Sequence, residues 1–310
     1  MFRRVVFLSL LSLPVFAQNT AALGGTIQDS TGAVVPRAGV KLTSHEQGTV
    51  RTAESNQTGL YSFSFLPRGV YDIEVTATGF RTLSDKNITL STAESIRRDY
   101  TIEVGNVSDN VTVSANAQTV NTDNAEMGAV LDNTKVTEMP LNGRTFYSLA
   151  SLTPGATAPL NNQGFRGAFS VAGASQVSNN FTLNGMDNND PTIAIPNFRP
   201  SIDAIQEFNI LTGIYPAQYG LGSGGQIIVS TKSGTNNLHG SAYEFLRNSY
   251  MDARNFFSAP GTLPAFKRNQ FGSTIGGPIK KNKLFFFHSY EGLRLSQAHT
   301  ALTTDPPRPW

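Results

Sequence analysis

Apolar and polar residues alternate along several short stretches in the first third of the chain. Tyr61, Phe63 and Phe65 alternate with serines, and residues 71–78 repeat the pattern. Successive side chains of a strand point to opposite faces, so each stretch predicts a strand with one buried face. The other apolar positions predicted to be buried are Tyr71, Ile73, Val75, Ala77, Ile96, Tyr100 and Ile102. Turn-forming residues at 29–32, 56–59 and 67–69 separate the strands, which favours a small antiparallel sandwich.

The middle of the chain predicts a second, less regular sheet. Residues 154–155 are Pro-Gly, and Asn184-Gly185 stands between apolar residues, which is typical of a tight hairpin. Residues 226–232 predict a strand with Ile227, Val229 and Thr231 on one face. These signals indicate a small mixed sheet with long connecting loops.

Alternation with many aromatic residues returns after residue 234. Strands are expected at residues 241–247, 267–279 and 283–292, with a basic turn over residues 277–283. Aromatic and polar residues that alternate in this way are typical of outer-membrane barrels. A membrane strand takes about 9–11 residues, so residues 233–310 allow three or four strands, whereas a closed barrel needs at least about eight. The sequence therefore predicts only the beginning of a barrel, as in a fragment, an interrupted reading frame or a pseudogene product.

Composition excludes some partners and chemistries. Lys and Arg number 24 and Asp and Glu 22, so the net charge is +2 and no basic stripe favours a nucleic-acid partner. The chain has 0 cysteines, which excludes disulfides and thiolate metal sites.

The N-terminus predicts export. Arg3 and Arg4 precede an apolar run over residues 5–13, and small residues at 15 and 17 suit a cleavage site. The alternative, a membrane anchor, needs about 20 apolar residues and this run is shorter. Residues 1–17 are therefore predicted to be a signal peptide.

Several phrases in residues 20–105 resemble a known family. They are residues 25–29, 35–40, 59–63, 66–71 and 77–80. In this order they resemble the carboxypeptidase regulatory-like domain, which implies a transthyretin-like β-sandwich without catalytic function. Two interpretations stay open: a periplasmic spacer or docking surface, and a structural sandwich without a ligand.

Residues 106–115 are predicted to be a linker that contains one short alternating strand. Such a segment can add itself to the sheet edge of another protein. It resembles the TonB box, which implies the C-terminal domain of TonB as a partner; the alternative is an ordinary linker strand. The box residues would be Asp109, Asn110, Val111, Thr112, Val113, Ser114 and Ala115.

Residues 116–235 carry the most extended resemblance. Motifs at residues 139–144, 152–155, 164–167, 181–190, 201–208, 215–220 and 224–235 follow in order. They resemble the plug of TonB-dependent receptors of the Oar-like branch, which implies an α+β plug domain. The plug-motif residues are Asn142, Gly143, Arg144, Phe165, Arg166, Gly167, Asn184, Gly185, Asp187 and Asn188. Arg144 and Arg166 are expected either to latch the plug to barrel-wall carboxylates or to be solvated loop residues.

Signals that would indicate an enzyme fail on context. Residues 220–225 match G-x-G-x-x-G, but a β-branched strand follows where a dinucleotide site needs a helix. Residues 187–190 cluster oxygen ligands but lack the spacing of an EF-hand, so a turn is favoured. The four histidines have no zinc-ligand spacing. We therefore predict no catalytic residues, no metal site and no cofactor.

Taken together, the sequence predicts a mainly β protein: a transthyretin-like sandwich, an α+β plug and, over residues 236–310, the first strands of an incomplete outer-membrane barrel. The resemblance implies uptake of a nutrient (a siderophore, a saccharide or a peptide) across the outer membrane, where lipid would surround the barrel and the first two modules would be periplasmic or lumenal. The alternatives are a binding or adhesion protein without transport, and a non-functional truncated product.

Overall fold

The computed structural model describes residues 21–105, 110–113, 127–139, 141, 144–157, 169–192, 195–215, 219–220, 222–253 and 265–297. The predicted signal peptide lies outside these residues. The chain divides into two compact units, Met1–Thr231 and Lys232–Trp310, and each is described by itself.

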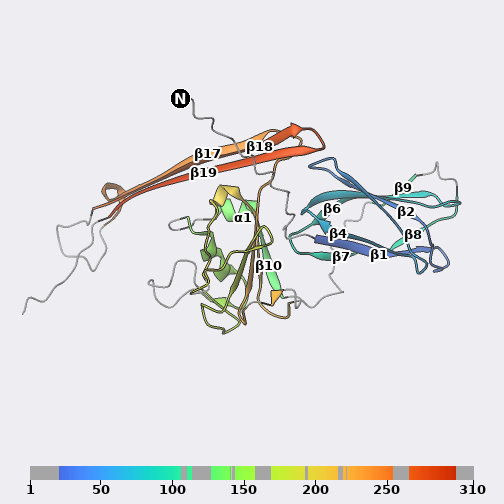
Figure 1. The fold of residues 1–310 in the computed structure, drawn as a ribbon, viewed down its shortest axis with the longest axis horizontal. Coiled ribbons are helices and arrows are strands. Elements are labelled where there is room, and N and C mark those ends of the chain that lie inside the picture. Colours follow the sequence, from blue (N-terminus) through green and yellow to red (C-terminus); the bar gives the residue numbers. More distant parts are fainter. Residues whose placement is uncertain are drawn as a thin grey trace, which may run out of the picture. The chain divides into compact units, whose positions relative to one another are not determined.

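Two sheets at the start of the first unit form a β-sandwich (Figure 1). One sheet holds β1 (Ala21–Asp29), β4 (Leu60–Leu66), β7 (Ser95–Arg97) and β8 (Tyr100–Ile102). The other has the order β3-β2-β5-β6-β9, with β2 (Gly39–Ser44), β3 (Val50–Glu54), β5 (Gly69–Thr76), β6 (Thr82–Leu90) and β9 (Asn110–Val113). The predicted sandwich is confirmed.

The alternation in the sequence correctly predicts most of the sandwich core. Ile73 and Val75 are fully buried, and their polar neighbours along β5 are only partly buried. Tyr100 is also buried, and its hydroxyl donates to Asp85 Oδ2 at 2.9 Å. Burial raises the pKa of Tyr100 above its usual range, and the charge of Asp85 adds to the shift. This hydrogen bond lets a polar hydroxyl sit inside an apolar core.

Phe65 departs from the predicted pattern. Tyr61 and Phe63 are buried, but Phe65 is 75% exposed and Leu66 enters the core instead. The pairing of β4 with β1 shifts register at this point, and Phe65 has a φ of 57°. One residue in the left-handed region reverses the order of inward and outward side chains, as at a bulge. The prediction that Phe65 shares the buried face is therefore wrong.

This difference can be tested with two alanine substitutions. Phe63→Ala is expected to lower the free energy of unfolding of the sandwich by about 3–5 kcal/mol, because it empties a core position. Phe65→Ala removes an exposed side chain and is expected to change the same free energy by less than about 0.5 kcal/mol. Urea unfolding of the two variants measures both values, and equal losses would contradict the assignment.

A five-stranded mixed sheet lies in the second part of the first unit, which we call the mixed-sheet module (residues 127–231). Its order is β10-β15-β16-β13-β14, with β13 and β16 parallel and the other pairs antiparallel. The strands are β10 (Gly128–Asp132), β13 (Asn180–Leu183), β14 (Met186–Asp187), β15 (Ile205–Leu211) and β16 (Gln226–Thr231). Short elements complete the module: α1 (Asn133–Glu138), η1 (Phe146–Leu152), β11 (Ala156–Thr157), β12 (Ser170–Val171) and η2 (Ile202–Ala204).

The predicted hairpin and the predicted strand are both present in this module. Asn184 and Gly185 have φ of 50° and 81° and connect β13 to β14, which confirms a tight hairpin. Strand β16 matches the predicted strand, but both of its faces are covered: Ile227, Ile228 and Val229 are all buried. Ile227 and Val229 lie on the predicted face, and Ile228 adds a buried apolar side chain to the other face.

The second unit contains an antiparallel sheet of three strands (Figure 1). They are β17 (His239–Asn248), β18 (Phe266–Lys280) and β19 (Leu284–Gln297), and η4 (Ser249–Met251) follows β17. All three predicted strands are confirmed, but the turn is shorter than expected. Only residues 281–283 form it, with Asn282 at a φ of 62°, while Gly277 and Pro278 belong to β18 next to a register shift.

Among the described residues, no helix combines the length and the apolar character needed to cross a membrane.

Candidate functional site

The predicted TonB box is partly described. Asn110–Val113 forms the edge strand β9, which pairs in parallel with β6 of the sandwich. Asp109, Ser114 and Ala115 lie outside the described residues. The segment is thus extended, as expected, and it belongs to the second sheet of the sandwich.

Arg144, one of the two predicted arginines of the plug motif, forms an ion pair inside its own module. Arg144 donates to Asp203 of η2, and its side chain is only 14% exposed. The backbone carries Arg144 there through a turn in which its N–H donates to the Leu141 carbonyl and its φ is 51°. The interpretation of Arg144 as a solvated loop residue is therefore wrong, and its contact with a barrel wall stays a prediction.

Three other plug-motif residues stabilise loops of the module. Asn184 bonds β16 in both directions: its Nδ2 donates to Thr231 Oγ1, and its Oδ1 accepts from the Thr231 N–H, each at 2.9 Å. Asn188 holds the backbone of Phe198 in the same way, at 2.8 and 2.9 Å. Asp187 accepts from the Asn189 N–H at 3.0 Å. These contacts are structural, as the turn interpretation of residues 187–190 predicts.

The structure does not describe the other five plug-motif residues. They lie outside the described residues and are Asn142, Gly143, Phe165, Arg166 and Gly167.

One face of the mixed sheet is apolar and the other carries buried polar side chains. Phe208 and Ile210 of β15 lie in the apolar core, whereas Glu207 and Asn209 alternate with them on the opposite face. The polar face continues along the sheet through hydrogen bonds between amides. Asn189 Nδ2 donates to Asn180 Oδ1 at 2.7 Å, and Asn180 Nδ2 donates to Gln226 Oε1 at 2.7 Å.

Glu207 connects this polar face to the sandwich, and sequence reasoning missed it. Its carboxylate is buried and accepts from the Thr92 N–H at 2.7 Å and from Arg68 at 3.3 Å. Thr92 also donates through its hydroxyl to Ser230 at 3.1 Å and accepts from Asn209 Nδ2 at 3.4 Å. We call these five residues the Glu207 contact.

The environment of Glu207 changes its acidity. Burial raises the pKa of Glu207 above its ordinary value, although the Thr92 N–H and the Arg68 charge act in the opposite direction. A buried carboxylate with two donors forms a specific link between the sandwich and the mixed-sheet module.

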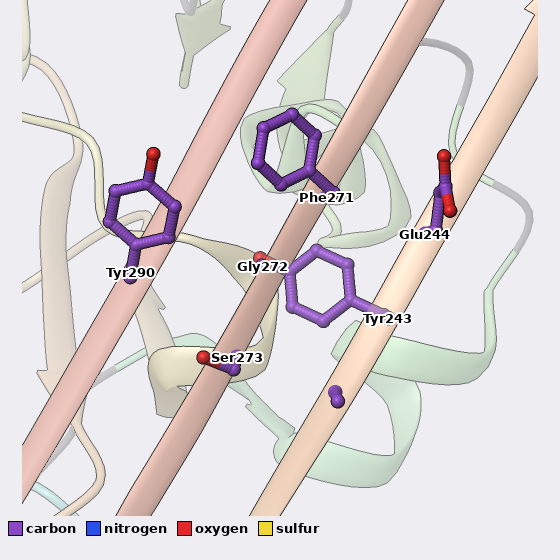
Figure 2. A pocket seen from close by; sticks show the side chains of 7 residues that line it. Tyr243, Glu244, Phe271, Gly272, Ser273 and Tyr290 are labelled. Carbon is purple, nitrogen blue, oxygen red and sulfur yellow. The ribbon is translucent and has the colours of Figure 1, made fainter.

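A shallow groove crosses the three-stranded sheet (Figure 2). Phe271 and Tyr290 lie along it with ring centroids 6.4 Å apart, and Glu244 lies at its edge. Gly272 leaves room for Tyr243, since a Cβ there would be 2.5 Å from the tyrosine oxygen. The Tyr243 hydroxyl donates to Glu291 at 2.8 Å. The groove lacks the enclosure of a small-molecule site.

The described part of the chain contains no group of three or more His, Cys, Asp or Glu side chains able to hold a metal ion. The glycine-rich segment before β16 leads into that strand, and Gly222 has a φ of 89°. A strand therefore follows this segment, as expected, where a dinucleotide site would need a helix.

Comparison with known proteins gives the class of the chain. Residues 22–105 match the carboxypeptidase regulatory-like domain, and residues 230–309 match an outer membrane beta barrel domain. The chain thus combines a regulatory-like β-sandwich with a segment similar to an outer membrane beta barrel domain, and this match supports an outer-membrane location.

Within this class the chain is a homologue of the TonB-dependent transporter Oar of Myxococcus xanthus. The two are 26% identical over 299 residues, which cover 92% of this chain and 28% of that protein. The chain therefore spans less than a third of the length of this relative.

Two solved structures are similar to part of the chain. Chlorocatechol 1,2-dioxygenase from Pseudomonas putida aligns with a TM-score of 0.25 and 10% identity, over 29% of this chain and 63% of that one. The major pilin SpaD from Corynebacterium diphtheriae aligns with a TM-score of 0.23 and 12% identity, over 27% and 30%. Similarity at this level says nothing about function.

Proposed function

We propose that this chain supplies the periplasmic sandwich, the plug and barrel strands of a TonB-dependent transporter that takes up a nutrient across the outer membrane. The observation that carries the proposal is the alignment with Oar over 92% of the chain, together with the match of residues 230–309 to an outer membrane beta barrel domain. The strands of the second unit suit a membrane wall. They have 10, 15 and 14 residues, and about 9–11 are enough to cross the bilayer.

The mixed-sheet module is the proposed plug. Two features support this role: the module has its own apolar core, and the opposite face of its sheet carries hydrogen-bonded polar side chains. A polar face is compatible with a hydrated barrel lumen, because water satisfies the amide groups whenever a partner leaves. Arg144, which forms an ion pair with Asp203, is the proposed site of a contact with the barrel wall.

The proposed TonB-binding segment is residues 109–115. Its described part, Asn110–Val113, is extended and precedes the proposed plug in the chain. An extended segment binds a partner by adding itself as a strand, through backbone hydrogen bonds. The proposed substrates are a siderophore, a saccharide or a peptide. Uptake of a radiolabelled member of each class by cells with and without the full-length protein selects among them.

The TonB interaction is tested with Val113→Pro in the full chain. Proline removes a backbone donor, and the loss of one or two strand hydrogen bonds is expected to weaken binding of the TonB C-terminal domain by about tenfold or more. Val113→Thr retains the N–H and is the matched control, with binding close to that of the wild type. Surface plasmon resonance measures all three affinities. If Val113→Pro binds as tightly as the control, the segment is not the TonB box.

The same substitution is also tested in cells. Cells that carry Val113→Pro are expected to lose nutrient uptake while the amount of the protein in the outer membrane stays normal. Uptake that does not depend on the presence of the protein favours a binding or adhesion protein over a transporter.

A further inference from the structure

The segment proposed to bind TonB is held by the sandwich. Strand β9 is the last strand of the sheet β3-β2-β5-β6-β9 and pairs with β6 from Thr82 opposite Asn110 to Asp85 opposite Val113 (Figure 1). Within the described residues, no strand pairs with the other edge of β9. The sandwich therefore presents one edge of this segment with its backbone groups free of strand partners.

Backbone contacts just before β9 hold the chain next to the sandwich. Val104 forms a bridge with Phe80, and the Gly105 N–H donates to the Gly79 carbonyl at 3.1 Å. Only residues 105–109 then separate the bridge from β9. A tether this short keeps the segment at a millimolar effective concentration next to the edge of β6, so the pairing is favoured without strong side-chain contacts.

Holding the segment in an extended form lowers the entropic cost of adding another strand. Fixing the backbone of each residue costs conformational entropy, and β9 is already ordered when the partner arrives. Binding along the outer edge of β9 keeps every hydrogen bond between β9 and β6. Binding in place of β6 would break them first.

We propose that the outer edge of β9 is a docking edge for the TonB C-terminal domain, so that the regulatory-like sandwich presents the TonB-binding segment as part of its own sheet. The inference rests on the proposed function, because it takes TonB as the partner of this segment. TonB then extends the five-stranded sheet by its own strand. A pull on this edge acts on the sandwich, and the Glu207 contact joins the sandwich to the mixed-sheet module.

A disulfide between β6 and β9 tests the inference. Ser84 and position 112 are directly paired, and the same row across the sheet contains Glu74 and Lys41, whose side chains are exposed. Neighbouring strands are about 4.8 Å apart, which suits a disulfide. Because the chain contains 0 cysteines, Ser84→Cys with Thr112→Cys creates a single defined crosslink. Lys41→Cys with Glu74→Cys, which joins β2 to β5 in the same row, is the matched control.

The full-length chain with each cysteine pair is titrated with the TonB C-terminal domain, oxidised and reduced. If β9 is captured on β6, oxidation of the 84/112 pair leaves the dissociation constant within about threefold or tightens it, since the crosslink fixes the extended form. A weakening of about tenfold or more on oxidation, reversed by reduction and absent in the control, means that the segment must leave β6 and overturns the inference. Failure of the wild-type chain to bind TonB overturns the proposed function and the inference with it.

Hydrogen exchange on the unmodified chain gives a second, independent measurement. On binding of TonB, the amides of residues 82–85 are expected to keep their protection, while residues 110–113 gain protection. Loss of protection in residues 82–85 on binding contradicts capture on β6, whatever the result with the crosslinked chains.

Discussion

Replacement of Phe208 by alanine is expected to lower the free energy of unfolding of the mixed-sheet module by about 3–5 kcal/mol. Phe208 is fully buried on β15 and packs edge to face against Phe146 at 5.4 Å and Tyr147 at 6.0 Å between ring centroids. The substitution empties the centre of an aromatic cluster formed by β15 and η1. The loss therefore includes both the buried area and the cavity that remains.

Hydrogen exchange in increasing urea measures this effect, because peptides from the mixed-sheet module and from the sandwich are followed separately. Phe198→Ala is the matched control: the residue is 60% exposed, and its backbone is held by Asn188 independently of the side chain. The control is expected to change stability by less than about 0.5 kcal/mol. A loss below about 1 kcal/mol for Phe208→Ala would contradict the core described for this module.

Replacement of Glu207 by alanine is expected to lower the free energy of unfolding of the mixed-sheet module by about 3 kcal/mol. The substitution leaves the buried Thr92 N–H without its acceptor and Arg68 without the buried carboxylate it faces. Exchange of the amides of β15 and of the residues around Thr92 is expected to accelerate together. Glu74→Ala removes the carboxylate of an exposed pair with Lys41 and is the control, with an expected loss of 0 to about 1 kcal/mol. Equal losses of stability from the two substitutions would show that the Glu207 contact stabilises the chain no more than an exposed ion pair does.

The contribution of Glu207 to stability is expected to depend on pH. Burial raises the pKa of Glu207 in the folded chain, so its titration adds stability that is fully present below the pKa of the unfolded state. This stability is lost as pH rises through the folded-state pKa. Glu207→Gln does not titrate. The stability of the wild type relative to this variant is therefore expected to increase as pH is lowered from about 8 to about 5.

Local patterns in the sequence predicted local structure well. Alternation around Ile73 and Val75 gave the buried face of β5, and Asn184-Gly185 gave the hairpin, because period and turn chemistry depend only on neighbouring residues. Phe65 failed because a left-handed residue shifted the register, and the flanking residues contain no signal for it. Gly277 and Pro278 failed as a turn for a related reason: an irregularity within β18 accommodates them.

Contacts between distant segments were beyond such patterns. Glu207 looked like the polar position of an ordinary alternating strand, and only the fold brings Arg68 and Thr92 to it. The pairing of β9 with β6 is similar, because an alternating segment states that it can form a strand but does not state which edge it joins. The resemblance to known families supplied the order of the modules, and it did not supply these two contacts.

The two unlike faces of the mixed sheet imply two different rules for which substitutions it can accept. Three consecutive residues of β15 show the difference. Phe208 packs among apolar side chains, whereas Glu207 and Asn209 form hydrogen bonds, which require a donor and an acceptor in fixed positions. Apolar positions tolerate exchanges that conserve volume, but a buried amide loses its partner when donor and acceptor are swapped. In related sequences with this fold, the apolar face should therefore accept different apolar residues of similar total volume. On the polar face, a residue should change only together with its hydrogen-bond partner. Along one strand, the freedom to vary would alternate with every residue.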